Sequence, residues 1–288
     1  MPPNWQLRTI SLVLDRPRIL GIVNVTPDSF SDGGQFFSGN AAVEHAVQLV
    51  EEGADLIDVG GESTRPQGAT PVSVGDELAR VLPVVRALRA RLPHVPISVD
   101  TVKSEVAAAV LDEGAEVIND VSAFRLDPRG AAVCARADAG VILMHSRGAV
   151  SDMATYVHAE YEADVVADVI RELSASAAGA EAAGVARCRI ALDPGIGFAK
   201  RSEHSLGVLA GLPRLADLGY PLVVGVSRKR FIGELSGVRE PAQRIEGTIA
   251  ANVMALAAGA RIFRVHDVRA ARRALDVAWG ILQSGTGA

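Results

Sequence analysis

The chain has 288 residues, 22% of them charged, and a formal net charge of −5 at pH 7. A mildly acidic chain without a basic run is not typical of a nucleic-acid-binding protein, so we expect no nucleic-acid partner. No stretch approaches the ~18 uninterrupted apolar residues of a membrane span, and residues 1–17 lack the apolar core of a signal peptide. We therefore expect no membrane partner and a cytoplasmic location. Cys134 and Cys188 have no CxxC or metal-ligand spacing, and both are expected to be small buried hydrophobic residues.

Two parts are predicted, an N-terminal extension (1–17) that forms a small hairpin or lid, and a region (18–288) in which apolar runs and helical patterns alternate. The predicted strands are 19–25, 55–61, 96–101, 116–122, 140–145, 189–195, 221–229 and 261–267. The predicted helices are 40–53, 74–92, 102–114, 129–139, a helix or helix pair within 155–184, 203–219, 242–259 and 270–282. This unbroken alternation predicts a single (β/α)8 TIM barrel. The alternative is an open doubly wound sheet, but GIVNVTPDSF after the first strand is not its Gly-rich phosphate turn.

The first predicted strand ends in an abrupt change of chemistry. Asn24 is the only hydrogen-bonding side chain in the run Ile19–Val25, and turn-forming residues follow it at 26–29. A strand that delivers one polar residue into a long loop is typical of α/β active sites, although an ordinary surface turn fits this segment equally well. The recurrence of the same event at other strand ends favours a site.

Every predicted strand except the fifth ends with a charged or amide side chain that can be placed on the inward face, because residues two apart share a face. At the carboxyl ends this inward set comprises Asn24, Asp58, Asp100, Asn119, Asp193, Ser227, Lys229, Arg264 and His266. The carboxyl ends of the strands are where barrel enzymes place their sites. The pattern therefore predicts a pocket there.

Several of these positions have a structural alternative. Asp58 is more often a cap of the next helix or turn than a ligand contact. Asp100 and Asp193 lie in apolar strands and need donors, either from an ion-pair network with Lys229 or Arg264 or from a ligand. His145 closes the fifth strand, and the structural and functional interpretations of this histidine both stay open.

The inward set divides into two chemistries. Asp100, Asn119 and Asp193 supply acceptors with one amide donor, which suits a flat heterocycle with N–H groups on its edge. Donors suited to phosphate oxygens come from Asn24, Arg65, Arg264 and His266. The site therefore fits a heterocyclic phosphate ester, and the loop at 60–69 could fold over a second substrate.

Seven ordered segments, GIVNVTPDSFSDGG, DVGGESTRP, SVDT, INDVS, LDPGIGF, VGVSRKRF and RVHD, resemble the dihydropteroate synthase family over about residues 18–282. The resemblance implies a transferase of folate biosynthesis that joins 6-hydroxymethyl-7,8-dihydropterin pyrophosphate to 4-aminobenzoate and is a sulfonamide target. It also implies a homodimer, for which the Ala-rich helix Gln243–Ala258 is a candidate contact, although its small residues are equally explained by packing on the barrel.

The resemblance further implies roles for individual residues. The pterin would be held by Asp100, Asn119, Asp193 and Lys229, with Arg264 packed over its ring. Asn24 would help to coordinate a Mg²⁺ on the pyrophosphate, which Arg264 and His266 would contact; Asp100, Lys229, Arg264 and His266 are the implied catalytic residues. The aminobenzoate site would be shaped by Thr64, Arg65, Pro66, Phe198, Ser227 and Lys229, and the loop that closes over it would carry Asp28, Phe30 and Asp32.

Two departures from the family pattern are visible. Gln67 resembles a one-residue insertion beside the aminobenzoate site, which leaves affinity for aminobenzoate and sulfonamides less certain than pterin binding. Arg230 replaces a frequent serine, and we expect little effect because adjacent strand positions face opposite ways. A catalytically silent pterin-binding paralogue and a pterin-dependent methyltransferase remain as alternatives.

Overall fold

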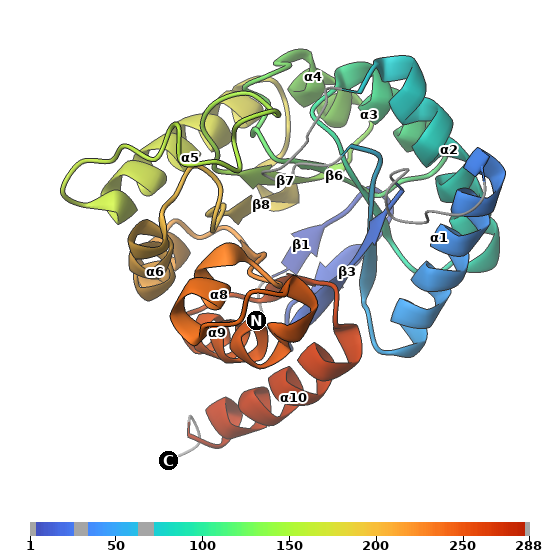
Figure 1. Cartoon of the computed structure of the whole chain (residues 1–288). Helices are drawn as coiled ribbons and strands as arrows, with labels where there is room; N and C mark the ends of the chain where they lie inside the picture. The colour runs from blue at the N-terminus through green and yellow to red at the C-terminus, as the bar shows by residue number, and fades with distance from the viewer. Residues whose placement is uncertain (1–3, 26–33, 63–71, 286–288) are drawn as a thin grey trace.

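A ring of parallel strands forms the centre of the molecule, and helices surround it (Figure 1). The computed structural model describes residues 4–25, 34–62 and 72–285. Within these ranges the ring contains eight strands: β3 (Arg18–Asn24), β4 (Leu56–Gly60), β5 (Ile97–Asp100), β6 (Val117–Asp120), β7 (Gly140–Met144), β8 (Ile190–Asp193), β9 (Val223–Val224) and β10 (Ile262–Val265). They are hydrogen-bonded in the order β8-β7-β6-β5-β4-β3-β10-β9, and a parallel bridge between Leu192 and Leu222 joins the two end strands. The predicted (β/α)8 barrel is confirmed, and the open doubly wound sheet is excluded.

The outer layer consists of the helices that follow the strands. In the described part of the chain they are α1 (Gly34–Glu51), α2 (Val74–Arg91), α3 (Ser104–Asp112), α4 (Arg129–Arg136), α5 (Val165–Ala182), α6 (Ser202–Ala210), α7 (Leu212–Ala216), α8 (Arg230–Ser236), α9 (Ile245–Ala257) and α10 (Val268–Ser284). Each amphipathic helix buries one face against the ring; on α2 this face includes Val81, Val84, Val85 and Leu88. Among the described helices none is long and apolar enough to span a bilayer.

The N-terminal hairpin closes the amino end of the barrel. Its strands β1 (Asn4–Gln6) and β2 (Ser11–Val13) are antiparallel, and β1 lies across the centre of the ring (Figure 1). Trp5 is fully buried, and its Nε1 donates to the carbonyl oxygen of Arg189 at 2.8 Å. The apolar hairpin side chains pack with the inward residues Leu20, Leu56, Val117, Ile142, Ala191, Val223 and Ile262. Of the two predicted alternatives, hairpin or lid, the hairpin is confirmed.

This inner apolar layer also tests which strand faces point inward. Four polar residues each follow a member of this apolar layer by two positions on the same strand: Asp58, Asn119, Asp193 and Arg264. Their side chains therefore form the next layer towards the carboxyl ends of the strands. The structure therefore agrees with the inward face derived from the two-residue period.

Three sequence predictions need correction. The strand predicted at 221–229 is only β9, because the chain leaves the sheet before Arg228, whose φ is 59°, and the unpredicted helix α8 follows. The helix predicted at 203–219 is divided into α6 and α7 at Gly211, whereas the helix or helix pair predicted within 155–184 is the single helix α5. Cys134 is buried as expected, but Cys188 is exposed in a 3-10 turn (Arg187–Arg189).

Candidate active site

A fully buried carboxylate, Asp58, organises the floor of the site. Its oxygens accept hydrogen bonds from Ser98 Oγ at 2.6 Å, Asn119 Nδ2 at 3.1 Å and Arg264 Nε at 2.6 Å. Three donors from three other strands offset the cost of burying this charge. The expectation that Asp58 caps the following helix or turn is wrong. Its position inside the apolar strand LIDVG is a sequence feature that could have indicated buried partners, and the register places Ser98 opposite it.

Arg264 joins two carboxylates across the barrel. Besides its bond to Asp58, its Nη2 donates to Asp100 Oδ2 at 2.9 Å. Burial alone would lower the pKa of Arg264, but Asp58 and Asp100 raise it above its ordinary value. The guanidinium is thus fixed in orientation before any ligand arrives.

Asn119 presents an acceptor to the site and not the amide donor that we predicted. Because its Nδ2 is used by Asp58, the hydrogen-bond network assigns the carbonyl oxygen Oδ1 as the remaining polar atom of the side chain. This correction strengthens the acceptor character of the floor.

Asp193 lies deep in the barrel beside an open inner face. Its Oδ1 accepts a hydrogen bond from the backbone N–H of Gly195 at 2.7 Å, and Asp193 is only 5% exposed. Gly225 leaves room here, since an added Cβ would lie 3.7 Å from Arg264 Cβ and 3.8 Å from Asp193 Oδ2. Burial raises the pKa of Asp193, and the opposing charge of Lys229 only partly compensates.

The floor has more acidic than basic groups. Three carboxylates, those of Asp58, Asp100 and Asp193, face two cations, Arg264 and Lys229. Burial raises the pKa of Asp100 to about 8, although Arg264 opposes this shift. A ligand edge that carries N–H donors would supply the missing partners, because a carboxylate and an amide oxygen can each accept from it.

Lys229 stands beside the floor, although it is not on a strand as predicted. It is the residue before α8; its Nζ donates to the carbonyl oxygen of Ile196 and lies 4.5 Å from the centre of the Phe198 ring. Burial lowers the pKa of Lys229 to about 8, against the attraction of Asp193. The bidentate pair of Arg228 with Asp267, at 2.9 and 2.6 Å, ties this loop to the end of β10.

The remaining polar groups lie at the carboxyl rim. Ser227 Oγ accepts from the backbone N–H of His266 at 3.2 Å and lies 3.0 Å from its Nδ1, which favours the tautomer protonated on Nε2. Asn24 lies near Asp100, because an added Cβ on Gly60 would be 3.7 Å both from Asn24 Oδ1 and from Asp100 Cβ. No group of three or more His, Cys, Asp or Glu side chains that could hold a metal occurs among the described residues.

Several predicted site residues lie outside the described residues. They are Asp28, Phe30, Asp32, Thr64, Arg65, Pro66 and the insertion Gln67. Arg230 is described, but the reason given for its small effect is wrong, since it begins α8 and does not lie on a strand. Its guanidinium carbon is 3.7 Å from the centre of the Tyr156 ring, a cation–π distance.

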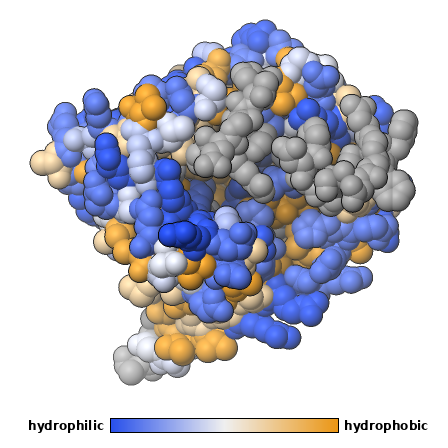
Figure 2. All heavy atoms as spheres, viewed as in Figure 1, coloured by the Kyte–Doolittle hydropathy of each residue, from blue (hydrophilic) through white to orange (hydrophobic). Residues whose placement is uncertain are grey.

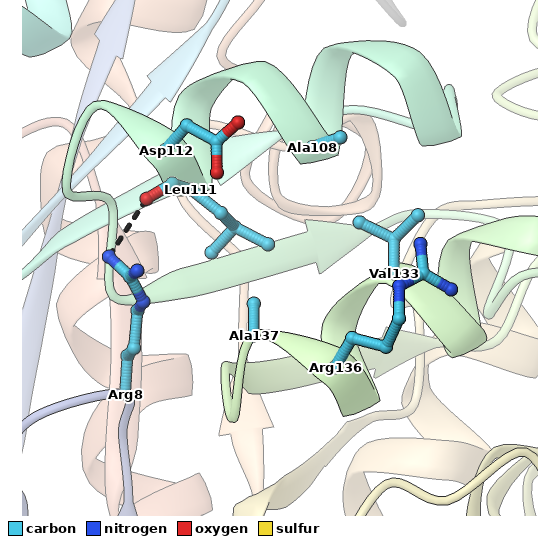
Figure 3. Close-up of a pocket in the computed structure, with 7 residues that line it drawn as sticks. All are labelled: Arg8, Ala108, Leu111, Asp112, Val133, Arg136 and Ala137. Atoms are coloured by element: carbon cyan, nitrogen blue, oxygen red, sulfur yellow. Dashed lines mark hydrogen bonds between the residues drawn. The ribbon is translucent and has the colours of Figure 1, made fainter.

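A separate pocket lies on the outside of the barrel between α3 and α4 (Figure 3). It has a volume of about 340 Å³ and is lined by Arg8, Ala108, Leu111, Asp112, Val133, Arg136 and Ala137. None of the predicted site residues lines it. The convergence of buried charge at the carboxyl ends of the strands, and not this groove, therefore identifies the candidate active site.

The barrel and its acceptor-rich floor define a class of protein that binds a pterin. A family described as pterin binding enzyme matches residues 20–266. The dihydropteroate synthase of Neisseria meningitidis serogroup C is 46% identical over 282 residues, covering 96% of this chain and 97% of that protein. The chain belongs to the dihydropteroate synthase family.

Solved structures show the same relation. Dihydropteroate synthase from Xanthomonas albilineans with 4-aminobenzoic acid is 48% identical with a TM-score of 0.90, covering 98% of this chain and 99% of that one. Dihydropteroate synthase from Thermus thermophilus in complex with 6HMPPP is 45% identical with a TM-score of 0.82, covering 97% and 99%.

Proposed function

We propose that this chain condenses 6-hydroxymethyl-7,8-dihydropterin pyrophosphate with 4-aminobenzoate to give 7,8-dihydropteroate and pyrophosphate. The observation that carries the proposal is the surplus of acceptors on the floor formed by Asp100, Asn119 and Asp193. The family relation supports it, and the ligands named for the related structures have the two chemistries that the site accommodates.

The floor is suited to the pterin ring. An amino group and an adjacent ring N–H can donate to one carboxylate together, and Asp193 Oδ2 accepts no hydrogen bond from the described residues. Asp100 and Asn119 Oδ1 would receive further donors from the same heterocycle. Binding would pair groups whose burial is otherwise unfavourable, which favours a ligand of this donor pattern over an isostere without it.

The reaction breaks the bond between the pterin methylene carbon and the bridging pyrophosphate oxygen and forms a bond from that carbon to the amine nitrogen. Negative charge develops on the departing oxygen, so cations placed there stabilise the transition state more than the ground state. Arg264 and His266 would supply this stabilisation. The pterin ring spreads the positive charge left on the methylene carbon, so the protein needs no covalent nucleophile.

A Mg²⁺ ion fits the site only as a companion of the pyrophosphate. The described residues offer the amide oxygen of Asn24 beside Asp100, and magnesium is commonly held by one or two protein ligands together with substrate phosphates and water. Asn24 would hold the ion, which would neutralise charge on the leaving pyrophosphate.

The aminobenzoate would bind next to Lys229. The centre of the Phe198 ring lies 4.5 Å from Lys229 Nζ, and this ring offers an apolar surface to an aromatic ring, while the ammonium can receive a carboxylate. Ser227 lies nearby and orients His266.

The test is formation of dihydropteroate by the purified chain with both substrates and Mg²⁺. Product formation, and growth of a strain that lacks its own synthase, are expected. Tight binding of the pterin pyrophosphate without product would reject turnover and favour a silent paralogue, while binding of methyltetrahydrofolate in its place would favour a methyltransferase.

A homodimer and a cytoplasmic location complete the proposal. Large apolar side chains are exposed on three consecutive helices: Leu235 on α8 at 63%, Met254 on α9 at 71%, and Val277 and Ile281 on α10 at 65% and 66%. Hydrophobic side chains gather over α10 in the lower part of the surface view (Figure 2). Such a patch is typical of an interface, and a second copy of the chain would cover it. Two free cysteines suit a reducing compartment.

A further inference from the structure

A second lysine lies buried behind the site and has no role in the reaction described above. Lys200 follows the loop between β8 and α6 and is 1% exposed. Its Nζ contacts His145 Nδ1 at 2.8 Å and the carbonyl oxygens of Gly195 and Phe198, each at 3.1 Å. A buried cation with three acceptors in hydrogen-bond range fixes the positions of the groups that carry those acceptors, here the His145 ring and the backbone at Gly195 and Phe198.

The three contacts fit an ammonium group. Burial lowers the pKa of His145 to about 4, so its ring is neutral, and its Nε2–H donates to Glu172 Oε2 at 3.0 Å. His145 Nδ1 is then an acceptor, as both carbonyl oxygens are, and only an ammonium has a proton for each. Burial and the charge of Lys229 lower the pKa of Lys200 well below its usual value, but a neutral amine would leave one acceptor without a donor. The two interpretations left open for His145 thus resolve to a structural link from α5 to Lys200.

The loop held by Lys200 forms one wall of the candidate active site. The carbonyl oxygens of Gly195 and Phe198 face Lys200, whereas that of Ile196 faces Lys229 from the other side. The loop is also bonded to the floor, since Gly195 N–H donates to Asp193. The backbone therefore separates two ammonium groups, one structural and one in the site.

The backbone of residues 195–199 has an unfavourable conformation that other contacts must stabilise. Gly195, Gly197 and Ala199 have φ values of 64°, 79° and 47°. A left-handed conformation is unfavourable for alanine, and such residues persist where surrounding contacts determine them. Gly195 admits no side chain, because an added Cβ would lie 1.8 Å from the carbonyl oxygen of His145.

We propose that Lys200 is a positioning residue for the condensation: its ammonium holds the loop so that Ile196 meets Lys229 and the Phe198 ring lies beside it, where aminobenzoate would bind. The inference rests on the proposed function, because that function assigns this side of the site to aminobenzoate. Among the described residues, Asp100, Asn119 and Arg264 have no hydrogen bond to the loop, so we expect the effect to fall on the second substrate and on Asp193.

The first test is the Lys200→Met variant, which keeps the apolar stem and removes the donors. We expect kcat/KM for aminobenzoate to fall by about 10²-fold, the size expected for a misplacement of about 1 Å. The Kd for pterin pyrophosphate should change by less than about tenfold. Leu88→Ala in α2, a fully buried site that follows β4 on the opposite side of the ring from β8, is the matched control for lost stability and should keep kcat/KM per folded molecule.

The second test is chemical rescue of Lys200→Ala. Ethylammonium can enter the space left by the side chain and donate to the same acceptors, whereas tetramethylammonium carries the charge without N–H groups. Recovery of kcat/KM with ethylammonium alone is expected. Recovery with both ions, or of thermal stability without activity, would overturn the positioning role.

Hydrogen exchange separates failure of this inference from failure of the proposed function. In Lys200→Met, amides of residues 195–199 should exchange faster while strand β8 stays protected, and Leu88→Ala should not show this pattern. If the wild-type chain forms no dihydropteroate but the exchange pattern appears, the proposed function fails and the role of Lys200 in the loop stands. Unchanged exchange together with unchanged aminobenzoate kinetics would overturn the inference.

Discussion

At the scale of single residues, the site depends on charged side chains whose orientation is fixed by ion pairs with other charged side chains. Asp58 contacts three donors and, fully buried, is not placed to reach a ligand, yet it fixes Arg264 and turns Asn119 so that its oxygen faces the site. Asp58 therefore acts on the site through the two side chains that it orients, Arg264 and Asn119.

Replacing Asp58 with Asn should therefore impair catalysis. The charge-assisted bond to Arg264 is worth about 1.5–3 kcal/mol, so we expect kcat/KM for pterin pyrophosphate to fall by about 10- to 100-fold. Asp55→Asn is the matched control: Asp55 precedes the same strand at the opposite end of the barrel, where it pairs with Arg16 and Arg18. Steady-state kinetics should show a loss for Asp58→Asn alone; equal losses would contradict its role on the floor.

The charge of Lys229 should appear in the pH profile. Its pKa is lowered to about 8, mainly by burial, and Asp193 raises it. The ammonium is lost as pH rises through this value, so kcat/KM for aminobenzoate, measured with pterin pyrophosphate saturating, should decline above about pH 8. Asp193→Asn removes the carboxylate that favours the charged form, so the decline should move to lower pH, besides weaker pterin binding. If kcat/KM of Asp193→Asn declines at the same pH as that of the wild-type chain, a group other than Lys229 titrates.

At the scale of elements, the hairpin and the loops occupy opposite ends of the barrel and serve different purposes. The hairpin fills the amino end with Trp5 and its apolar neighbours, while the polar side chains of the candidate site lie at the carboxyl ends of the strands and in the segments that follow them. This division of stability and function between the two ends is general for barrels.

Trp5→Ala should consequently destabilise the protein without altering the site. Loss of a fully buried tryptophan costs about 3–5 kcal/mol of the free energy of unfolding, and the bond from its Nε1 to Arg189 is lost as well. Urea denaturation measures this change, and Trp5→Phe should lose less because it keeps most of the apolar volume. Activity per folded molecule should stay at the wild-type value in both variants; a selective loss of kcat would place the hairpin in the catalytic machinery.

At the scale of the whole molecule, the exposed apolar side chains of α8, α9 and α10 form the strongest candidate for contact with a second copy. Met254→Glu with Ile281→Glu should shift a dimer to a monomer, because two charges from each chain would be buried together. Light scattering coupled to size-exclusion chromatography measures the mass. Val157→Glu is the control, since Val157 is 69% exposed and lies on none of these helices. A monomeric wild-type chain at every concentration would reject the homodimer.

Much of this molecule is determined by short-range patterns in the sequence. Apolar runs of strand length alternating with amphipathic helical segments can bury both faces only as a covered parallel sheet, which is why the barrel and its inward face were predictable. The same period placed Asp100, Asn119, Asp193 and Arg264 on the inward face.

The tertiary structure alone decided how those residues are paired. Asp58 and Arg264 are separated by 206 positions in the chain, and no local pattern specifies that ring closure brings them to 2.6 Å. The same holds for β9 and α8, since the left-handed turn at Arg228 is stabilised by contacts with Thr248 and Asp267 on later segments. Hydrophobic periodicity reports which way a side chain points, whereas its hydrogen-bond partner depends on which strands the closed ring makes neighbours.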